Sequence, residues 1–321
     1  MSTATAATAT TPLPDEGETR GMEQTTGKIK VTLTGVPETL LISLLGRARD
    51  AAARRPILGD PYAEGVMEKL DYDFGQLRLQ PTAVAAVSLR TRIYDGWATA
   101  FLATHPRATV LHLACGLDSR NQRVDWGASV RWIDVDLPEV AALRRQVLPT
   151  SFPGREYRLV AADATDQAWL EEIPTDRPVL VIMEGLLSYF PPAEATGLLG
   201  RLVEKLEEGE LHFDCMTAKV LKSSQENPKA APEKAGPLFQ WAVDDLKDVE
   251  RIHPHIKLIE AVRYIEAPGI EKFPFVARAT YFVMSCMPSL RDGIRFVRFG
   301  FSKGLMDDLA EVDALASPHL H

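Results

Sequence analysis

The 321-residue chain contains few cysteines, and their positions argue against two kinds of stabilising site. Cys115, Cys215 and Cys286 are scattered and form no CxxC pair. The sequence therefore predicts neither a disulfide framework nor a zinc site. The seven histidines include no HExxH spacing, so we expect an enzyme that works without a metal ion.

The chain also lacks an excess of positive charge and any long apolar run. Its 36 Lys and Arg residues are outnumbered by 44 Asp and Glu residues, and the formal net charge of −8 argues against a nucleic-acid partner. No apolar run is long enough to span a bilayer, and no basic segment followed by an apolar one marks a secretory signal. We therefore expect a cytoplasmic protein with no membrane partner.

Composition and apolar periodicity divide the chain into three regions. Residues 1–27 are rich in Ala, Thr, Gly and acidic residues, which predicts a disordered tail. Residues 28–107 are expected to form an N-terminal helical cap, and residues 108–321 the catalytic core. The helices predicted for the cap cover residues 36–54, 60–70 and 83–104.

Beyond residue 108, short apolar runs alternate with helical stretches, which is typical of a doubly wound α/β fold. The predicted strands are 109–114, 130–135, 157–161, 179–183, 211–215, 262–266 and 280–285. The predicted helices begin after Pro138 and cover 167–171, 192–208 and 239–251. Near-continuous apolar strands indicate a mostly parallel seven-stranded sheet that is covered on both faces. Residues 216–238 are polar and rich in Lys and Pro, which predicts an inserted lid or a disordered loop.

The segment 110–138 carries the main functional signal. An apolar strand leads into a turn of small residues at 114–116, and a second strand ends in Asp134 and Asp136. In open α/β sheets, ligands bind beyond the carboxyl ends of the strands, where a carboxylate can accept both ribose hydroxyls. The third glycine of GxGxxG is absent and the acidic Asp118 follows the turn, which disfavours NAD and suits a cationic sulfonium ligand. The alternative is a structural turn with solvent-facing acids.

Three linked segments resemble the leucine carboxyl methyltransferase family, which includes polyketide carboxyl methyltransferases of the tetracenomycin type. They are LACGLDSR at 113–120, IDVDLP at 133–138 and IMEGLLSYF at 182–190. The resemblance covers roughly residues 36–215. It implies a Rossmann-like class I methyltransferase fold, S-adenosylmethionine as cofactor and methyl transfer to an oxygen atom.

The chain departs from the family pattern at the turn and at the end of the second strand. Ala114 and Cys115 replace a glycine and an alanine, and Asp134 replaces a glutamate. The extra methyl group of Ala114 narrows the space for the methionine part of the cofactor.

The resemblance implies a set of cofactor-binding residues: Arg90, Ala114, Gly116, Asp134, Asp136, Asp163, Ala164 and Glu184. Arg90 would bind the methionine carboxylate, since a guanidinium can form a bidentate pair; a solvated helix face is the alternative. Asp136 is the first choice for the ribose hydroxyls and Asp134 the second. Asp163 and the backbone of Ala164 would bind the adenine, with a helix N-cap as the alternative for Asp163.

Glu184 and Tyr189 are the expected catalytic residues. The family places its glutamate near the methionine amino group, where a carboxylate also steadies the sulfonium. Tyr189 would donate a hydrogen bond to the acceptor, and a buried core tyrosine is the alternative. His112 is interpreted as a core residue. Arg47 and Arg49 are candidates for a cofactor or acceptor carboxylate, with a solvated helix face as the default.

The acceptor is expected to be a carboxylate. Such a group is already ionised at neutral pH and needs no general base, whereas a phenol with a pKa of about 10 needs a base or a positive neighbour. We therefore predict a methyl ester of a polyketide-like or aromatic acid. The alternatives are a phenolic O-methyltransferase of secondary metabolism and a cofactor-binding protein of this fold without methyl transfer. A nicotinamide-dependent reductase fits poorly, because the glycine fingerprint is incomplete.

Overall fold

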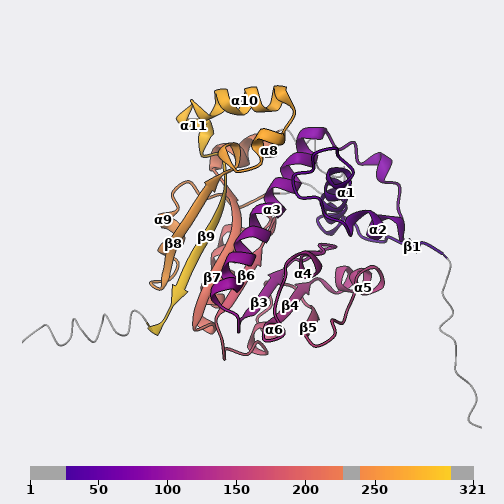
Figure 1. The fold of residues 1–321 in the computed structure, drawn as a ribbon. Helices are drawn as coiled ribbons and strands as arrows, with labels where there is room; N and C mark the ends of the chain where they lie inside the picture. Colours follow the sequence, from indigo (N-terminus) through magenta and orange to yellow (C-terminus); the bar gives the residue numbers. More distant parts are fainter. Residues whose placement is uncertain (1–26, 227–238, 305–321) are drawn as a thin grey trace, which may run out of the picture.

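The computed structural model of the chain describes residues 27–226 and 239–304. Its centre is a seven-stranded sheet with the order β5-β4-β3-β6-β7-β9-β8 (Figure 1). The strands are β3 (Thr109–Leu113), β4 (Arg131–Asp136), β5 (Glu156–Ala161), β6 (Val179–Met183), β7 (Glu208–Met216), β8 (Ile256–Arg263) and β9 (Ile294–Ser302). β9 runs antiparallel to both of its neighbours, and the other neighbouring pairs are parallel. The α/β class and the mostly parallel seven-stranded sheet are confirmed.

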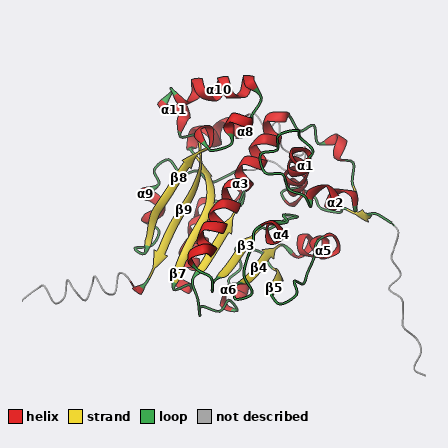
Figure 2. Cartoon of the chain, in the orientation of Figure 1, coloured by secondary structure: helices red, strands yellow, loops and turns green. Residues whose placement is uncertain are grey.

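Helices cover both faces of this sheet. The described α-helices are α1 (Leu40–Ala51), α2 (Ala63–Glu68), α3 (Pro81–Thr104), α4 (Arg120–Arg123), α5 (Pro138–Val147), α6 (Ala168–Glu171), α7 (Pro192–Lys205), α8 (Ala218–Glu226), α9 (Lys247–Glu250), α10 (Phe275–Ser285) and α11 (Pro288–Arg291). The second half of α3 lies across one face, where Phe101 joins the buried cluster of Trp132 and Leu180 (Figure 2). On the opposite face, α7 buries Leu198 in the cluster that contains Val181.

The strands of the parallel half follow from their sequences. All five residues of β3 and all five of β6 are buried, as expected for strands that are covered on both faces. α7 buries residues 195, 198, 199, 202 and 203, which is the spacing of one helix face. The five predicted strands between residues 109 and 215 correspond to β3–β7.

The C-terminal part of the sheet differs from the prediction. The predicted strand at 262–266 overlaps only the end of β8, and 280–285 lies within α10. The last strand is β9. The predicted helix at 239–251 is reduced to α9, because the chain before it donates backbone hydrogen bonds to its neighbours. Gln240 N–H donates to the Ser188 carbonyl over 2.7 Å, and Val243 N–H donates to the Met216 carbonyl over 2.8 Å.

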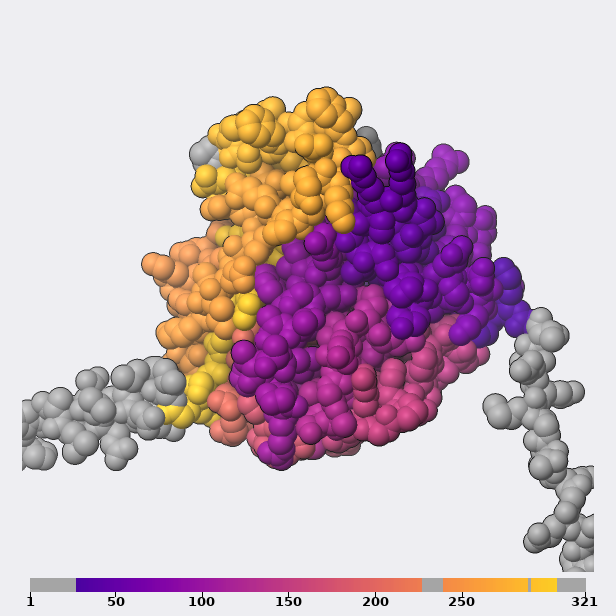
Figure 3. Space-filling view, viewed as in Figure 1, coloured from indigo at the N-terminus to yellow at the C-terminus, as the bar shows by residue number. Residues whose placement is uncertain are grey.

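The N-terminal region packs over one end of the sheet. β1 (Ile29–Lys30) pairs in parallel with β2 (Leu70–Asp71), and the short 3₁₀ helix η1 (Pro37–Thr39) leads into α1. α1 shares a buried cluster with α2 and α5. Figure 3 shows this indigo segment lying against the orange C-terminal part of the chain, where Lys272 donates to the Pro56 carbonyl.

Two predicted segments lie partly outside the described residues. Of the expected lid at 216–238, the structure shows the last residue of β7 and then α8, and residues 227–238 are not described. The expected tail at 1–27 falls almost wholly outside them. Within the described part of the chain, no helix combines the length and the apolar character needed to cross a membrane.

Candidate active site

A cavity of about 390 Å³ opens beyond the carboxyl ends of β3, β4, β5 and β6. The strand order reverses here, because the chain passes from β3 outward to β4 and β5 and then returns to β6 on the other side of β3. The volume is within the range of small-molecule sites. The predicted residues that line the cavity are Arg90, Ala114, Gly116, Asp136, Asp163, Ala164, Glu184 and Tyr189. Asp134 and the further candidate Arg49 do not line it.

The turn after β3 forms the floor of the cavity. Ala114 and Gly116 have φ angles of +50° and +49°, a region that glycine adopts freely and alanine only with strain. The Gly116 N–H donates to the Asp136 carboxylate over 2.6 Å, and Arg144 donates to the Gly116 carbonyl over 2.9 Å. The turn is therefore held from both sides.

Asp136 lies at the end of β4 and faces the cavity. Its two oxygens accept hydrogen bonds from the Gly116 N–H and, over 2.8 Å, from the Leu137 N–H. Burial raises the pKa of this carboxyl above its usual value, although both N–H groups oppose the shift. Because each carboxylate oxygen has more than one lone pair, Asp136 can accept further hydrogen bonds from a ligand.

Asp134, two residues earlier on β4, has a different environment, and we correct its predicted role as a cofactor ligand. Its carboxylate is fully buried and accepts hydrogen bonds from Arg144 over 2.6 Å and from the Tyr157 hydroxyl over 2.8 Å. Burial opposes its ionisation, but Arg144 and His112 outweigh this and lower its pKa to about 2. The cavity lies beyond the strand end, so Asp134 positions Arg144 and reaches no ligand.

Asp163 and Ala164 follow β5 and line the cavity next to Asp136. Asp163 Oδ1 accepts hydrogen bonds from the Thr165 N–H and hydroxyl, each over 2.8 Å. This is a local Asx turn and not the helix N-cap of the alternative, because the next helix, α6, begins at Ala168 with Gln167 at its N-cap. Within the described residues Oδ2 has no hydrogen-bond partner, so this oxygen can still accept one from a ligand.

Glu184 follows β6 and is held by three donors. Its Oε1 accepts from Arg90 Nε over 2.9 Å and from the Thr91 hydroxyl over 2.8 Å, and its Oε2 pairs with Arg120. Burial would raise the pKa of Glu184, but the charges of Arg120 and Arg90 outweigh it and lower the pKa below its usual range. The carboxylate is therefore ionised at neutral pH and fixed in orientation.

Arg90 lies between Glu184 and the cavity and not on a solvated helix face. Its Nη atoms make no hydrogen bond within the described residues, although Nη1 lies 3.8 Å from the carboxylate of Asp214. A Cβ at Gly185 would come within 3.0 Å of Nη1, and Gly185 has a φ of +63°. Glycine at this position therefore leaves room for the guanidinium, which keeps donors free for a ligand carboxylate.

Arg120 is a residue of the site that the sequence analysis missed. It is fully buried, donates from Nε to Asp95 over 2.7 Å and pairs with Glu184 through Nη2. Nη2 also lies 3.4 Å from Asp118, and Nη1 donates to His112 Nε2 over 2.9 Å. The sequence could have indicated Arg120, because it is the last residue of the LACGLDSR segment that resembles the family.

Other cavity residues have structural roles. His112 is buried; its Nε2 accepts from Arg120, and its Nδ1 lies 3.5 Å from Asp134 without a hydrogen bond among the described residues. Arg47 is buried, which makes the solvated-face interpretation wrong, but its donors are used on Asp60 and on the Leu117 carbonyl. Arg49, in contrast, is exposed and lines a different cavity.

The cap side of the cavity is mostly apolar. It is lined by Val36, Pro37, Leu40, Ile42, Leu186, Phe190 and Phe239. The ring of Tyr189 lies 5.0 Å from that of Phe239, and its hydroxyl is 3.5 Å from the Thr39 hydroxyl. Burial raises the pKa of Tyr189, so the hydroxyl is neutral and can donate a hydrogen bond. This side suits an aromatic or aliphatic acceptor.

Comparison with known proteins decides the family. The family model described as leucine carboxyl methyltransferase matches residues 41–203. The tetracenomycin polyketide synthesis O-methyltransferase TcmP of Streptomyces glaucescens is 36% identical over 272 residues, which cover 84% of this chain and 98% of that protein. The chain belongs to the leucine carboxyl methyltransferase family.

Other proteins that are similar to this chain agree with the family assignment. The S-adenosyl-L-methionine-dependent methyltransferase dpfgK of Gibberella zeae is 38% identical over 255 residues, 74% of this chain and 85% of that protein. A Thermobifida fusca protein that was solved as a candidate methyltransferase has a TM-score of 0.52 at 17% identity, over 84% of this chain and 95% of the other, which supports the fold. The predicted class I methyltransferase fold, S-adenosylmethionine dependence and O-methyltransferase activity are confirmed.

The residues of the cavity fit the family's cofactor. When bound, S-adenosylmethionine supplies a methyl group that is activated by a positively charged sulfur. The small residues at 114–116 let a bound cofactor come close to the backbone of this turn. The carboxylates of Asp136 and Glu184 can accept hydrogen bonds from hydroxyl or ammonium groups. The space beside Gly185 gives the Arg90 guanidinium access to the cavity, where it can pair with a carboxylate.

Proposed function

We propose that the enzyme transfers the methyl group of S-adenosylmethionine to the carboxylate of a small aromatic or polyketide-like acid, forming a methyl ester. The observation that carries this proposal concerns proton transfer. Among the described residues that line the cavity, the cysteine and the tyrosine are protonated at neutral pH, and His112 has its Nε2 engaged by Arg120. A carboxylate acceptor needs no general base.

Each of these side chains is unsuited for a specific reason. The Nε2 of His112 accepts a hydrogen bond from Arg120, and its buried Nδ1 lies 3.5 Å from the Asp134 carboxylate. Burial raises the pKa of the Tyr189 hydroxyl and of the Cys115 thiol above their usual values, so both are protonated. A phenol would enter this cavity protonated, and in this proposal the lining carboxylates Asp136, Asp163 and Glu184 bind the cofactor, which leaves none of them to remove the phenol proton.

The apolar cap side supports an aromatic or aliphatic acceptor body. The relative TcmP is named for tetracenomycin polyketide synthesis, which is consistent with such an acceptor. Tyr189 is the polar side chain on this side that we propose donates a hydrogen bond to an acceptor oxygen. We further propose that the reaction takes place in the cytoplasm, where Cys115 and Cys215, free thiols in the structure, would stay reduced.

The proposed cofactor contacts follow the geometry. Asp136 accepts the ribose hydroxyls, Asp163 and the Ala164 backbone bind the adenine, and Arg90 binds the methionine carboxylate. The backbone at Ala114 and Gly116 lies under the methionine part, and Glu184 accepts the amino group and lies near the sulfonium. These residues align donor and acceptor and exclude water, which is the main requirement of an in-line methyl transfer.

The test is incubation of the full chain with methyl-labelled S-adenosylmethionine and matched acceptors. We expect 2-naphthoate to give S-adenosylhomocysteine and a labelled product that mild alkali hydrolyses, and 2-naphthol to give none. An alkali-stable labelled product from 2-naphthol would indicate a phenol ether and overturn the carboxylate proposal. Cofactor binding without transfer to any member of a wider panel of aromatic and polyketide acids would support a non-methylating protein instead.

A further inference from the structure

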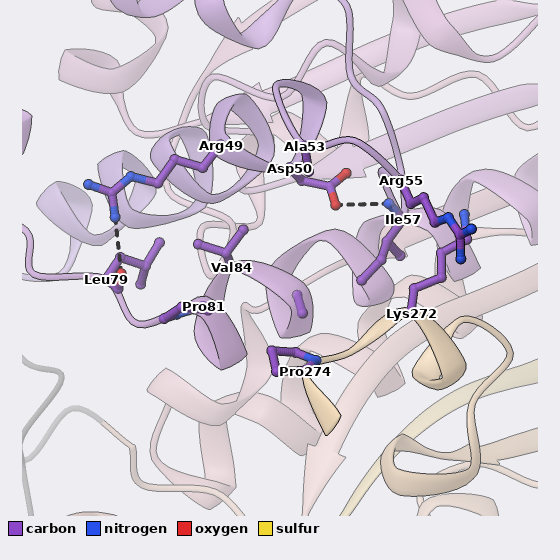
Figure 4. A pocket seen from close by; sticks show the side chains of 11 residues that line it. Arg49, Asp50, Ala53, Arg55, Ile57, Leu79, Pro81, Val84, Lys272 and Pro274 are labelled. Carbon is purple, nitrogen blue, oxygen red and sulfur yellow. Dashed lines mark hydrogen bonds between the residues drawn. The ribbon is translucent and has the colours of Figure 1, made fainter. Parts of the chain in front are cut away.

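A second cavity, of about 320 Å³, lies beside α1 and shares no lining residue with the active-site cavity. It is formed by three segments that are distant in the chain, 49–57, 79–85 and 272–274 (Figure 4). α1 presents Arg47 to the active site and Asp50 to this second cavity. A ligand here would therefore be separate from the methyl-transfer site.

Three cations line the second cavity without a carboxylate partner. Arg49 donates to the Leu79 carbonyl over 3.0 Å, and Lys272 donates to the Pro56 carbonyl over 2.6 Å. Arg55 makes no hydrogen bond to any residue that the structure describes. No described Asp or Glu lies within the 4.0 Å ion-pair distance of the three cations. A carbonyl partner orients a cation but leaves its charge uncompensated.

The acids nearest to these cations have other partners. Asp50 is the acid that lines the cavity, and its carboxylate accepts hydrogen bonds from the N–H groups of residues 57–59 over 2.8, 2.9 and 2.9 Å, one of which Figure 4 shows. Glu271 does not line the cavity, and it accepts from the Gly269 N–H over 2.8 Å. With three cations and one acid, the lining has a net positive charge in a chain whose formal charge is −8.

The rest of the lining is apolar. Ile57, Leu79, Pro81 and Val84 contribute side chains between Arg49 on one side and the segment of Arg55 on the other (Figure 4). Lys272 lies on the same side of the cavity as Arg55, because its Nζ donates to the carbonyl of Pro56, the residue after Arg55. The cavity thus combines an apolar surface with two exposed cations at one end, neither of which has an ion-pair partner among the described residues.

We propose that this cavity is a second binding site, specific for a small apolar carboxylate. The carboxylate pairs with Arg55 and Lys272, and the apolar body packs on Leu79, Pro81 and Val84. The methyl ester of the same acid has no charge to pair with these cations, so the site distinguishes an acid from its ester. The proposal concerns binding alone and does not depend on methyl transfer at the active site.

The experiment measures binding of 2-naphthoate to the full chain in the presence of saturating S-adenosylhomocysteine, by equilibrium dialysis. We expect Arg55→Gln to weaken one binding event by about fivefold and Arg55→Gln with Lys272→Gln to weaken it by about tenfold or more. Arg54→Gln is the matched control, because Arg54 is the adjacent exposed arginine and does not line the cavity. It should leave binding within about twofold of the unsubstituted chain.

Two further probes test the chemistry of the ligand. Methyl 2-naphthoate and inorganic phosphate should each bind this site at least about tenfold more weakly than 2-naphthoate, since each lacks one half of the recognised chemistry. Equal affinity for the ester or for phosphate would overturn the proposal. Equal binding of 2-naphthoate by the Arg55→Gln and Arg54→Gln variants would also overturn it. The Arg55→Gln variant should fold, because Arg55 makes no hydrogen bond to any described residue. Because dialysis does not need turnover, failure of methyl transfer leaves this result interpretable.

Discussion

The two sides of the active-site cavity are built in opposite ways. On the sheet side, buried charges are paired, as in Arg120 with Glu184 and Arg144 with Asp134. On the cap side the lining is mostly apolar, and the Tyr189 hydroxyl has a hydrogen bond of 3.5 Å to Thr39. Buried ion pairs fix orientation at the expense of desolvation, whereas apolar contacts accept different shapes. The comparison indicates a rigid cofactor side and a more permissive acceptor side.

The largest effect should come from breaking the buried network. We expect Arg120→Leu to lower the free energy of unfolding by about 3 kcal/mol, because the partly buried carboxylates of Glu184 and Asp95 both lose this partner. Arg158→Leu is the control, since it removes an arginine from an exposed pair with Glu172 and should cost less than about 1 kcal/mol. Urea unfolding measures both. Similar losses in the two variants would contradict the proposed difference.

The same substitution at two positions of β4 should separate structure from binding. Asp134→Asn should lower the free energy of unfolding by about 3 kcal/mol, since Arg144 loses its charged partner. Asp136→Asn should cost less, about 1–2 kcal/mol, because the amide keeps one of the two backbone acceptors and removes a buried carboxylate with a raised pKa. It should nevertheless weaken S-adenosylhomocysteine binding by about tenfold to a hundredfold, as measured by calorimetry. The reverse pattern would refute these roles.

These two carboxylates also predict how acid acts on the protein. Asp134 has a folded pKa lowered to about 2, so its contribution to stability is present above its usual value near 3.8 and is lost as pH falls from there toward 2. Asp136 has a raised pKa, so it is protonated at a higher pH. Cofactor affinity should therefore decrease at a higher pH than the Asp134 contribution to stability. We would drop this explanation if Asp136→Asn left the pH dependence of binding unchanged.

Two half-buried tyrosines offer a smaller contrast. Tyr189→Phe on the cap side should lower kcat/KM for the acid acceptor by about tenfold, through loss of one hydrogen bond, with cofactor affinity unchanged. Tyr157→Phe on the sheet side should instead cost about 1.5 kcal/mol of stability, because its hydroxyl donates to the Asp134 carboxylate. Steady-state kinetics and urea unfolding of both variants decide the matter. A loss of cofactor affinity in Tyr189→Phe would contradict the assignment of Tyr189 to the acceptor side of the cavity.

The smallest expected effect concerns the floor of the cavity. Ala114→Gly removes a side chain from a φ of +50°, which relieves about 1–2 kcal/mol of strain but adds about 0.4–1 kcal/mol of unfolded-state entropy. The net result should be a stabilisation of about 0.5 kcal/mol, detectable as a rise in Tm. A clear fall in Tm would show that the alanine methyl group makes packing contacts that outweigh the strain.

The parallel half of the sheet could be predicted because its strands are buried on both faces. The C-terminal part could not, and the run at 280–285 illustrates why. Its apolar residues indicated a strand, yet they form α10 with Phe282 and Val283 largely exposed, at 72% and 59%. An isolated apolar run has no period that separates strand from helix. The alternating segment at 294–302, which is β9, carried the strand signal and was overlooked.

The site shows a similar limit. The segments shared with the family placed Asp136, Glu184 and their neighbours correctly along the cavity. Strand alternation suggested that Asp134 would also face the ligand, but the cavity begins beyond the strand end. The role of Arg120 depends on Asp95 and Glu184, which are 25 and 64 residues away in the chain. Such long-range pairing is visible only in three dimensions.

The most direct test of the cofactor side is a crystal structure of the full chain with S-adenosylhomocysteine. We predict the ribose hydroxyls at the Asp136 carboxylate, the amino-acid carboxylate at Arg90, and the sulfur directed toward Tyr189 and the apolar cap side. A ligand bound elsewhere, or one whose sulfur points away from Tyr189, would contradict the arrangement of a fixed cofactor side and an apolar acceptor side.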